Sequence, residues 1–137
     1  MSEEEYQIGE SVMILTDNKT LLPYNTALGV IIDKRQELIN KEKTYIYKIK
    51  FVTTLANSEC HFYAKDLRHT NDYYPEFLTY CKIIDPLTDQ IFSILGCKKR
   101  KHDNKEVVDI LIPDKYFDFN NKWLCLDALL EKGWKLK

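Results

Sequence analysis

The segment 45–51, with the sequence Tyr-Ile-Tyr-Lys-Ile-Lys-Phe, constrains the fold of this chain more than any other. Successive side chains of a strand point to opposite faces of a sheet, so this alternation predicts one apolar and one charged face. The apolar set is Tyr45, Tyr47, Ile49 and Phe51, and the charged set is Lys48 and Lys50. The other periodic runs are short and rich in Val, Ile, Tyr, Phe and Thr, which predicts a mostly β protein.

Three more strand patterns and one helical turn accompany this segment in the first half of the chain. Strands are predicted over residues 11–15, 28–33 and 60–64, with a polar loop at 16–26, a charged linking segment at 34–43 and a helical turn at 65–67. Closing such short strands into a barrel hides the sheet edges. The first half is therefore predicted to form a small closed or half-closed β-barrel.

Two short motifs carry a family resemblance. Residues 6–12, Tyr-Gln-Ile-Gly-Glu-Ser-Val, resemble the entry strand of Src-homology-3-like, Tudor-like and KOW-like modules. Residues 62–67, Phe-Tyr-Ala-Lys-Asp-Leu, are similar to the closing strand and turn of the same modules. The resemblance covers about half of the chain and implies a small barrel with a tendency to bind partners.

The second half has a similar order of predicted elements. Strand patterns occur over 80–84, 91–97, 107–112 and 123–126. Three pairs of apolar residues share an offset of 62 positions, namely Ile32 with Ile94, Tyr45 with Val107 and Leu67 with Leu129. The predicted domains are a Src-homology-3-like barrel over 1–70, an extended connector over 71–76 and a second domain over 77–137.

Two structures for the second domain remain open. One is a second small barrel, which would make the protein a tandem of Src-homology-3-like barrels. The other is a small α+β domain with a C-terminal helix over 124–132, because Lys132 followed by Gly133 is typical of a helix end.

The net charge, the N-terminal residues and the cysteines limit the classes of function that the chain can have. The chain has 20 basic and 21 acidic side chains and a formal net charge of -1, which excludes a uniformly basic nucleic-acid-binding surface but leaves a local basic contact open. The acidic start predicts that the chain is not exported. No apolar run reaches the length of about 18 residues that a membrane-spanning helix needs, which predicts no membrane contact. The four cysteines form no C-x-x-C pair, which favours free thiols in a reducing cytoplasm.

No catalytic pattern is present in the sequence. The four glycines are too far apart for a phosphate-binding loop. Cys60 and His61 are adjacent, and neighbouring side chains of a strand point to opposite faces, so they cannot form a dyad. The cysteines and histidines also lack the spacing of a zinc site. We therefore predict a protein that is not an enzyme and has no metal or cofactor.

A basic run is the strongest local signal for binding. Lys98, Lys99, Arg100, Lys101 and His102 follow one another, and the sequence predicts them in a loop over 98–105 at a hairpin tip. Such a tip could contact phosphates or an acidic protein patch, with support from Lys48 and Lys50. A charged tip also serves simply to keep a loop solvated and to prevent edge-to-edge association.

Aromatic residues at predicted loops and element ends give the second signal. They are Tyr24, Tyr73, Tyr74, Tyr116, Phe117 and Phe119. The family resemblance implies that such rings line grooves for proline-rich or methylated-lysine ligands. In barrels this small, aromatic rings also plug the barrel mouths, so both roles remain open.

The sequence thus favours a cytoplasmic, non-enzymatic protein that binds a protein partner. One form of this hypothesis is a bacteriophage or mobile-element inhibitor that docks on a host or defence complex, like an anti-CRISPR protein. The alternative is a nucleic-acid-binding accessory domain that uses residues 98–102. A small hydrolase with an unrecognised carboxylate site is the third hypothesis.

Overall fold

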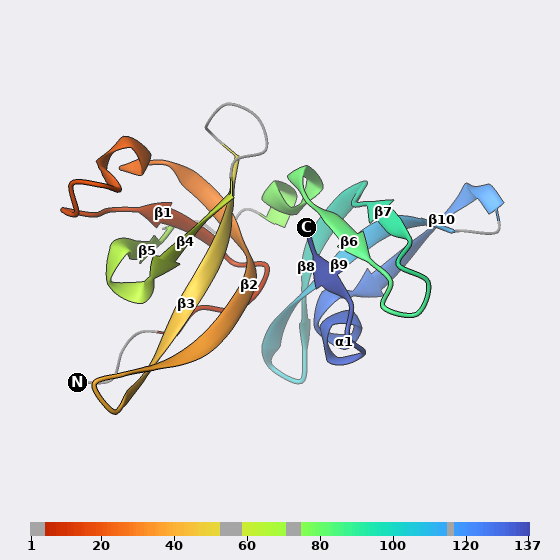
Figure 1. Ribbon diagram of the computed structural model, residues 1–137. Helices are drawn as coiled ribbons and strands as arrows, with labels where there is room; N and C mark the ends of the chain where they lie inside the picture. Colours follow the sequence, from red (N-terminus) through yellow and green to blue (C-terminus); the bar gives the residue numbers. More distant parts are fainter. Residues whose placement is uncertain (1–4, 53–58, 71–74, 115–116) are drawn as a thin grey trace. The chain divides into compact units, whose positions relative to one another are not determined.

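The computed structural model describes residues 5–52, 59–70, 75–114 and 117–137, and these residues are mostly in β-strands (Figure 1). The chain divides into two compact units, Met1–Tyr74 and Pro75–Lys137. Every strand pair among the described residues is antiparallel. The prediction of a mostly β fold is confirmed.

The described strands of the first unit form one sheet in the order β4-β3-β2-β1-β5. They are β1 (Ser11–Ile14), β2 (Leu28–Ile39), β3 (Glu42–Phe51), β4 (Glu59–Tyr63) and β5 (Leu67–His69). The 3-10 turn η1 (Leu22–Tyr24) lies between β1 and β2, and η2 (Ala64–Asp66) joins β4 to β5. The turn η2 lies one residue before the predicted helical turn, while β5 lies outside the predicted strands. Because β5 pairs with β1, the closing strand returns to the first strand.

The apolar face of β3 lies at the centre of this unit's core. Tyr47 and Ile49 are fully buried and Phe51 is nearly so, as the alternation predicts. Other buried side chains come from the N-terminal segment and the neighbouring strands: Tyr6, Val12, Ile14, Ile31, Phe62 and Leu67. Burial of each large apolar side chain contributes about 1.5–3 kcal/mol, so this cluster holds the sheet together.

The hairpin between β2 and β3 is longer than the sequence pattern predicts. Only Asn40 and Lys41 separate the two strands, and their φ angles are 50° and 67°. Two left-handed residues form the type I′ turn that matches the twist of a hairpin. The prediction of a charged linking segment at 34–43 is therefore wrong, because Lys34 and Arg35 pair in register with β3. Backbone pairing extends the strands past the core, where charged side chains reach solvent.

The described residues of the second unit form two three-stranded sheets, with the orders β10-β9-β8 and β11-β6-β7. The strands are β6 (Lys82–Ile84), β7 (Ile91–Ser93), β8 (Gly96–His102), β9 (Lys105–Asp114), β10 (Phe117–Cys125) and β11 (Lys135–Leu136). Helix α1 (Leu126–Glu131) precedes β11. Here too the closing strand returns to the first, because β11 pairs with β6.

The segment before β6 is helical. The 3-10 helix η3 (Pro75–Tyr80) begins at a proline, whereas the sequence predicts an extended connector over 71–76. That prediction is wrong at residues 75 and 76, and residues 71–74 lie outside the described structure. Proline is tolerated in the first turn of a helix because the missing N–H group would have no partner there.

The C-terminal helix ends at the glycine that the sequence indicates. Gly133 has a φ of 96° and its N–H donates to the Leu130 carbonyl at 3.1 Å, while the Trp134 N–H donates to the Leu129 carbonyl at 3.0 Å. These are the two hydrogen bonds of a Schellman cap. The helix over 124–132 that one alternative predicts is thus present, although it begins at Leu126.

Replacing the capping glycine should destabilise the second unit. We expect Gly133→Ala to lower its free energy of unfolding by about 1–2 kcal/mol, because a left-handed conformation costs a residue with a Cβ about that much. The added Cβ would lie 3.6 Å from Pro86, so the cost comes from the backbone alone. Denaturant unfolding measures the change. The control Gly96→Ala adds the same methyl group at an ordinary φ, and equal losses in both variants would contradict this account.

Candidate functional site

The basic run 98–102 lies in a paired strand. It is part of β8 (Gly96–His102), which pairs with β9 along its whole length. Asp103 and Asn104, with φ angles of 51° and 64°, form the hairpin turn that follows. The prediction of a basic loop over 98–105 is therefore wrong. Five consecutive cations show no alternation of apolar and polar residues, so the sequence gives no sign of a strand here. The strand forms because its backbone hydrogen-bonds to β9 and the apolar side chains of β9 fix the register.

The strand geometry divides the cations between two faces. Lys98 lies opposite Asp109 of β9 in register and shares one face with Arg100. Lys99 lies on the other face, where its Nζ is 3.9 Å from a carboxylate oxygen of Glu106. The five consecutive cations therefore do not form one continuous basic surface.

Trp123 lies on the same face of the sheet as Lys98, on the edge strand β10. Leu111 lies opposite both Gly96 and Trp123 in register, so these residues form a row across β8, β9 and β10. The Trp123 side chain is exposed, and the Lys98 Nζ lies 4.2 Å from its ring centroid. A cation over an indole ring is attracted by the ring's electron density. We call this surface the Trp123 face; its residues are Gly96, Lys98, Arg100, Asp109, Leu111 and Trp123.

An ion pair crosses the Trp123 face. The Arg100 Nε donates to Asp109 Oδ2 at 2.6 Å, and the Asp109 side chain is only 10% exposed. This hydrogen bond raises the pKa of the Arg100 guanidinium above its ordinary value. The pair therefore favours the charged form of Arg100 and holds both side chains in place on the sheet.

The remaining predicted cations lie elsewhere. Lys48 and Lys50 belong to the first unit and are half-buried on the outer face of β3, where the Lys48 Nζ is 3.1 Å from a Glu59 oxygen and Lys50 lies opposite Glu59. Lys101 is exposed on the face of Lys99, and the His102 Nε2 lies 3.5 Å from an oxygen of Asp103. The structure thus brings Lys98 to Trp123 and Arg100 to Asp109 on the same face.

The predicted partner-binding aromatics do not form one described cluster. Tyr24 stacks on Phe51 with ring centroids 5.1 Å apart and meets Phe62 edge to face at 5.9 Å, so it packs on the core of the first unit. This packing removes Tyr24 from the candidate site. Tyr73, Tyr74 and Tyr116 lie outside the described residues. The backbone of Phe117 and Phe119 belongs to β10, and their side chains also lie outside the described part.

Sequence reasoning missed Trp123 and Asp109 as partners of the basic run. In the sequence, Trp123 marks only the start of the strand pattern at 123–126, and nothing there links Asp109 to the basic run. The contact depends on the register of three strands, which no local pattern specifies. The one usable signal is that Asp109 interrupts an apolar run over 107–112, where a buried carboxylate needs a partner, and Asp109 is in fact buried like Ile110 and Ile112.

Comparisons with protein-family models, curated proteins and solved structures found no match to this chain. Among the described residues, no three histidine, cysteine, aspartate or glutamate side chains gather as a metal site. None of the helices in the described part has the length and apolar character needed to cross a membrane. The choice of the Trp123 face as the candidate site therefore rests on its geometry alone.

Proposed function

We propose that this chain is a non-enzymatic binding protein that docks on an acidic patch of a protein partner through the Trp123 face. The observation that carries the proposal is the exposed Trp123 ring with Lys98 over it and Arg100 on the neighbouring positions of the same face. Tryptophan and arginine are the residues that most often dominate protein interfaces, because each combines a large apolar area with directed hydrogen bonds.

The charges of this face suit an acidic partner. The register places His102 and Lys105 on the same side as Lys98 and Arg100, further toward the hairpin turn. Asp109 is the acid among them, and it is already bound to Arg100. A partner with acidic side chains around an apolar pocket would meet these cations while its pocket covers Trp123.

A protein partner is favoured over nucleic acid, the alternative. Two cations of the basic run, Lys99 and Lys101, lie on the opposite face, and Arg100 is held by a carboxylate at 2.6 Å. A nucleic acid on the Trp123 face would place phosphates beside Asp109. Affinity for phosphates rises with the number of cations that can neutralise them, so this arrangement is poor for a strand of nucleic acid.

The tandem Src-homology-3-like architecture is part of the same proposal. In the first unit, a helical turn precedes the closing strand, which returns to the first strand. In the second unit, α1 precedes β11, which returns to β6. The two-residue turns that begin at Asn40 and at Asp103 are separated in the sequence by nearly the same offset of 62 residues. These parallels support two related modules, and modules of this size commonly act by binding.

An inhibitory role against a host or defence complex is a further proposal of this kind. It requires only that the partner bound at the Trp123 face be part of such a complex. An inhibitor that occupies a channel or blocks a conformational step needs no catalytic group. A binding surface such as the Trp123 face is sufficient for that role.

Affinity capture tests the docking proposal. The tagged full chain is immobilised and exposed to nuclease-treated lysate of the native host. We expect one stoichiometric protein to be recovered, and we expect Lys98→Glu to lose it because the reversed charge repels an acidic patch. The control Lys135→Glu reverses an exposed strand lysine of the same unit outside this face and should retain it.

Two results would contradict the proposal. One is a partner that Lys98→Glu and Lys135→Glu retain equally. The other is a capture that recovers nucleic acid from untreated lysate and no protein from nuclease-treated lysate. In that case the binding constant for nucleic acid should also fall steeply with salt.

A further inference from the structure

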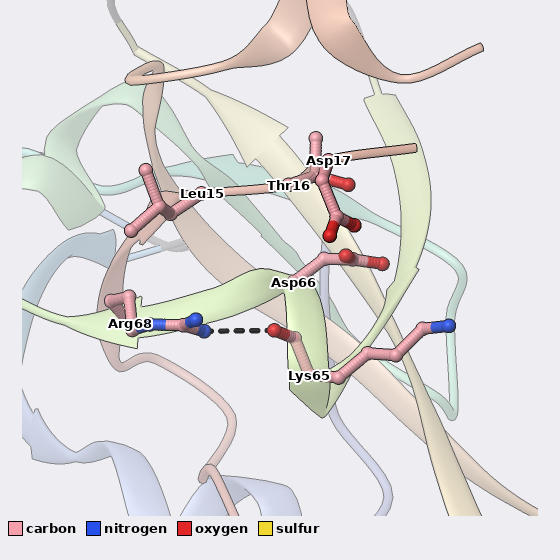
Figure 2. A pocket seen from close by; sticks show the side chains of 6 residues that line it. All are labelled: Leu15, Thr16, Asp17, Lys65, Asp66 and Arg68. Atoms are coloured by element: carbon pink, nitrogen blue, oxygen red, sulfur yellow. Dashed lines mark hydrogen bonds between the residues drawn. The ribbon is translucent and has the colours of Figure 1, made fainter. Parts of the chain in front are cut away.

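The first unit has an open pocket at the junction of β1 and η2. It encloses about 400 Å³ (Figure 2). Its lining comes from two segments far apart in the sequence: Leu15, Thr16, Asp17, Lys65, Asp66 and Arg68. The Leu15 N–H donates to the Asp66 carbonyl at 2.9 Å, which holds the two segments together.

Asp66 is the unusual member of this lining. Its side chain belongs to a residue that is only 4% exposed, yet it faces the pocket (Figure 2). Among the described residues, its carboxylate takes part in no hydrogen bond or ion pair, and its oxygens keep some contact with solvent, since no fully buried side-chain oxygen in this part of the chain lacks a partner. A carboxylate on a residue that is mostly buried keeps only part of its hydration, and without protein donors that loss is not compensated. A ligand with positively charged donors would supply what is missing.

The neighbouring cation does not fill this role. The Arg68 Nη1 donates to the Lys65 carbonyl at 2.8 Å (Figure 2). It also donates to the Leu67 carbonyl at 2.8 Å, so the guanidinium is bound to the backbone. The loop on the other side is also fixed, because the Thr16 N–H donates to Asn25 Oδ1 at 3.0 Å. The Asp66 carboxylate is therefore held in a preformed site.

We propose that this pocket binds the guanidinium group of an arginine side chain from a protein partner. Asp66 would accept two parallel hydrogen bonds, the geometry in which arginine binds carboxylates most strongly. Asp17 adds a second negative charge at the exposed side, and the half-exposed Leu15 offers apolar surface to the arginine stem. This site belongs to the first unit and is independent of the Trp123 face.

A divalent cation is the less suitable occupant. Calcium prefers six to eight oxygen ligands, and only two carboxylates line the pocket. The planar guanidinium of arginine needs a single well-placed carboxylate, which Asp66 provides.

The test is a titration of the isotope-labelled full chain with N-acetyl-arginine methylamide, followed by NMR of the backbone amides. We expect saturable shifts at residues 15–17 and 65–68. The citrulline analogue has nearly the same shape without the charge, and it should cause no such shifts. Asp66→Asn should weaken arginine binding at least tenfold, whereas Glu42→Gln, which removes an exposed charge of the same unit, should leave it unchanged.

Three results would overturn the proposal. The first is equal shifts from the arginine and citrulline compounds, a comparison that needs only the native chain. The second is calcium or magnesium binding at residues 15–17 and 65–68 with no arginine binding. The third is an Asp66→Asn chain that stays folded and binds arginine as tightly as the native chain. Because the Trp123 face is not involved, failure here and failure of partner capture are separate outcomes.

Discussion

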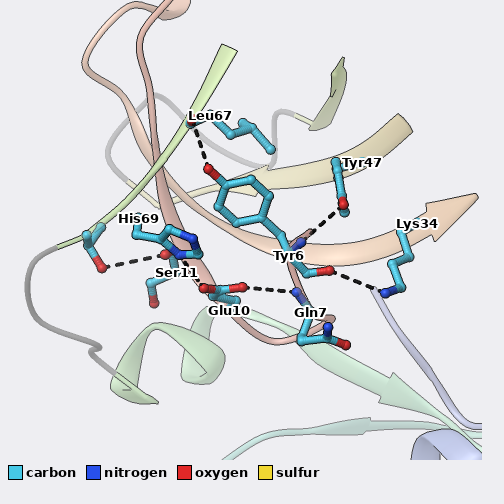
Figure 3. Close-up of polar contacts among 9 residues, drawn as sticks. Tyr6, Gln7, Glu10, Ser11, Lys34, Tyr47, Leu67 and His69 are labelled. Carbon is cyan, nitrogen blue, oxygen red and sulfur yellow. Dashed lines mark hydrogen bonds and ion pairs between the residues drawn. The ribbon is translucent and has the colours of Figure 1, made fainter. Parts of the chain in front are cut away.

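Tyr6→Ala is expected to lower the free energy of unfolding of the first unit by about 3–5 kcal/mol, the cost of deleting a buried aromatic ring. Tyr6 is fully buried, and its hydroxyl donates to the Leu67 carbonyl at 2.9 Å (Figure 3). Its backbone N–H donates to the Tyr47 hydroxyl at 3.1 Å, and the two rings meet edge to face. Tyr6 therefore joins the N-terminal segment to β3 and to the start of β5.

A polar pair covers the outer side of the same ring. The His69 ring lies 4.4 Å from the Tyr6 ring, and its Nδ1 is 2.6 Å from Glu10 Oε1 (Figure 3). The other Glu10 oxygen accepts the Gln7 N–H at 2.9 Å. Removing the ring would leave this pair over a cavity, so the loss includes packing on both sides.

Denaturant unfolding followed by circular dichroism measures the effect. Tyr6→Phe is the companion variant, because it keeps the ring and loses only the hydroxyl. We expect it to fold and to lose about 1 kcal/mol, the typical net contribution of one hydrogen bond. A loss below about 1 kcal/mol for Tyr6→Ala would contradict the central place of this ring.

Trp123→Ala is expected to weaken binding of the captured partner by about 30-fold or more, which corresponds to the 2 kcal/mol that defines an interface hot spot. The variant should stay folded because the Trp123 side chain is 45% exposed and lies outside the core. The change removes the ring that Lys98 covers and leaves Leu111 as the apolar part of the face.

Titration calorimetry with the purified partner measures this loss. Leu87→Ala is the matched control, because it truncates an apolar side chain of the same unit that is 92% exposed and lies outside the Trp123 face. We expect its affinity to equal that of the native chain. If both variants bind equally well, Trp123 does not contact the partner.

The elements with strong alternation could be predicted from the sequence. The apolar face of β3 follows directly from the residue pattern of 45–51, the turn η2 lies one residue before the predicted turn at 65–67, and Gly133 correctly marks the end of α1. In these segments the local preference and the tertiary environment agree. The charged strand ends could not be predicted, because residues 34–39 and 98–102 carry no apolar period and depend on their partner strands.

The two candidate sites depend on long-range contacts. Trp123 meets Lys98 only because β9 sets the register of both neighbouring strands. Asp66 meets the segment of Leu15 only because the chain turns at η2 and β5 then pairs with β1. The sequence names the residues in both cases, but it contains no local signal for which of them meet.

The central claim is that a protein partner covers Trp123, and fluorine NMR tests it most directly. The chain has two tryptophans, so 5-fluorotryptophan labelling gives two signals, and Trp134→Phe assigns them. When the captured partner is added, we predict that the Trp123 signal shifts and broadens while the Trp134 signal stays in place. An unchanged Trp123 signal in a complex that has demonstrably formed would contradict the proposed function.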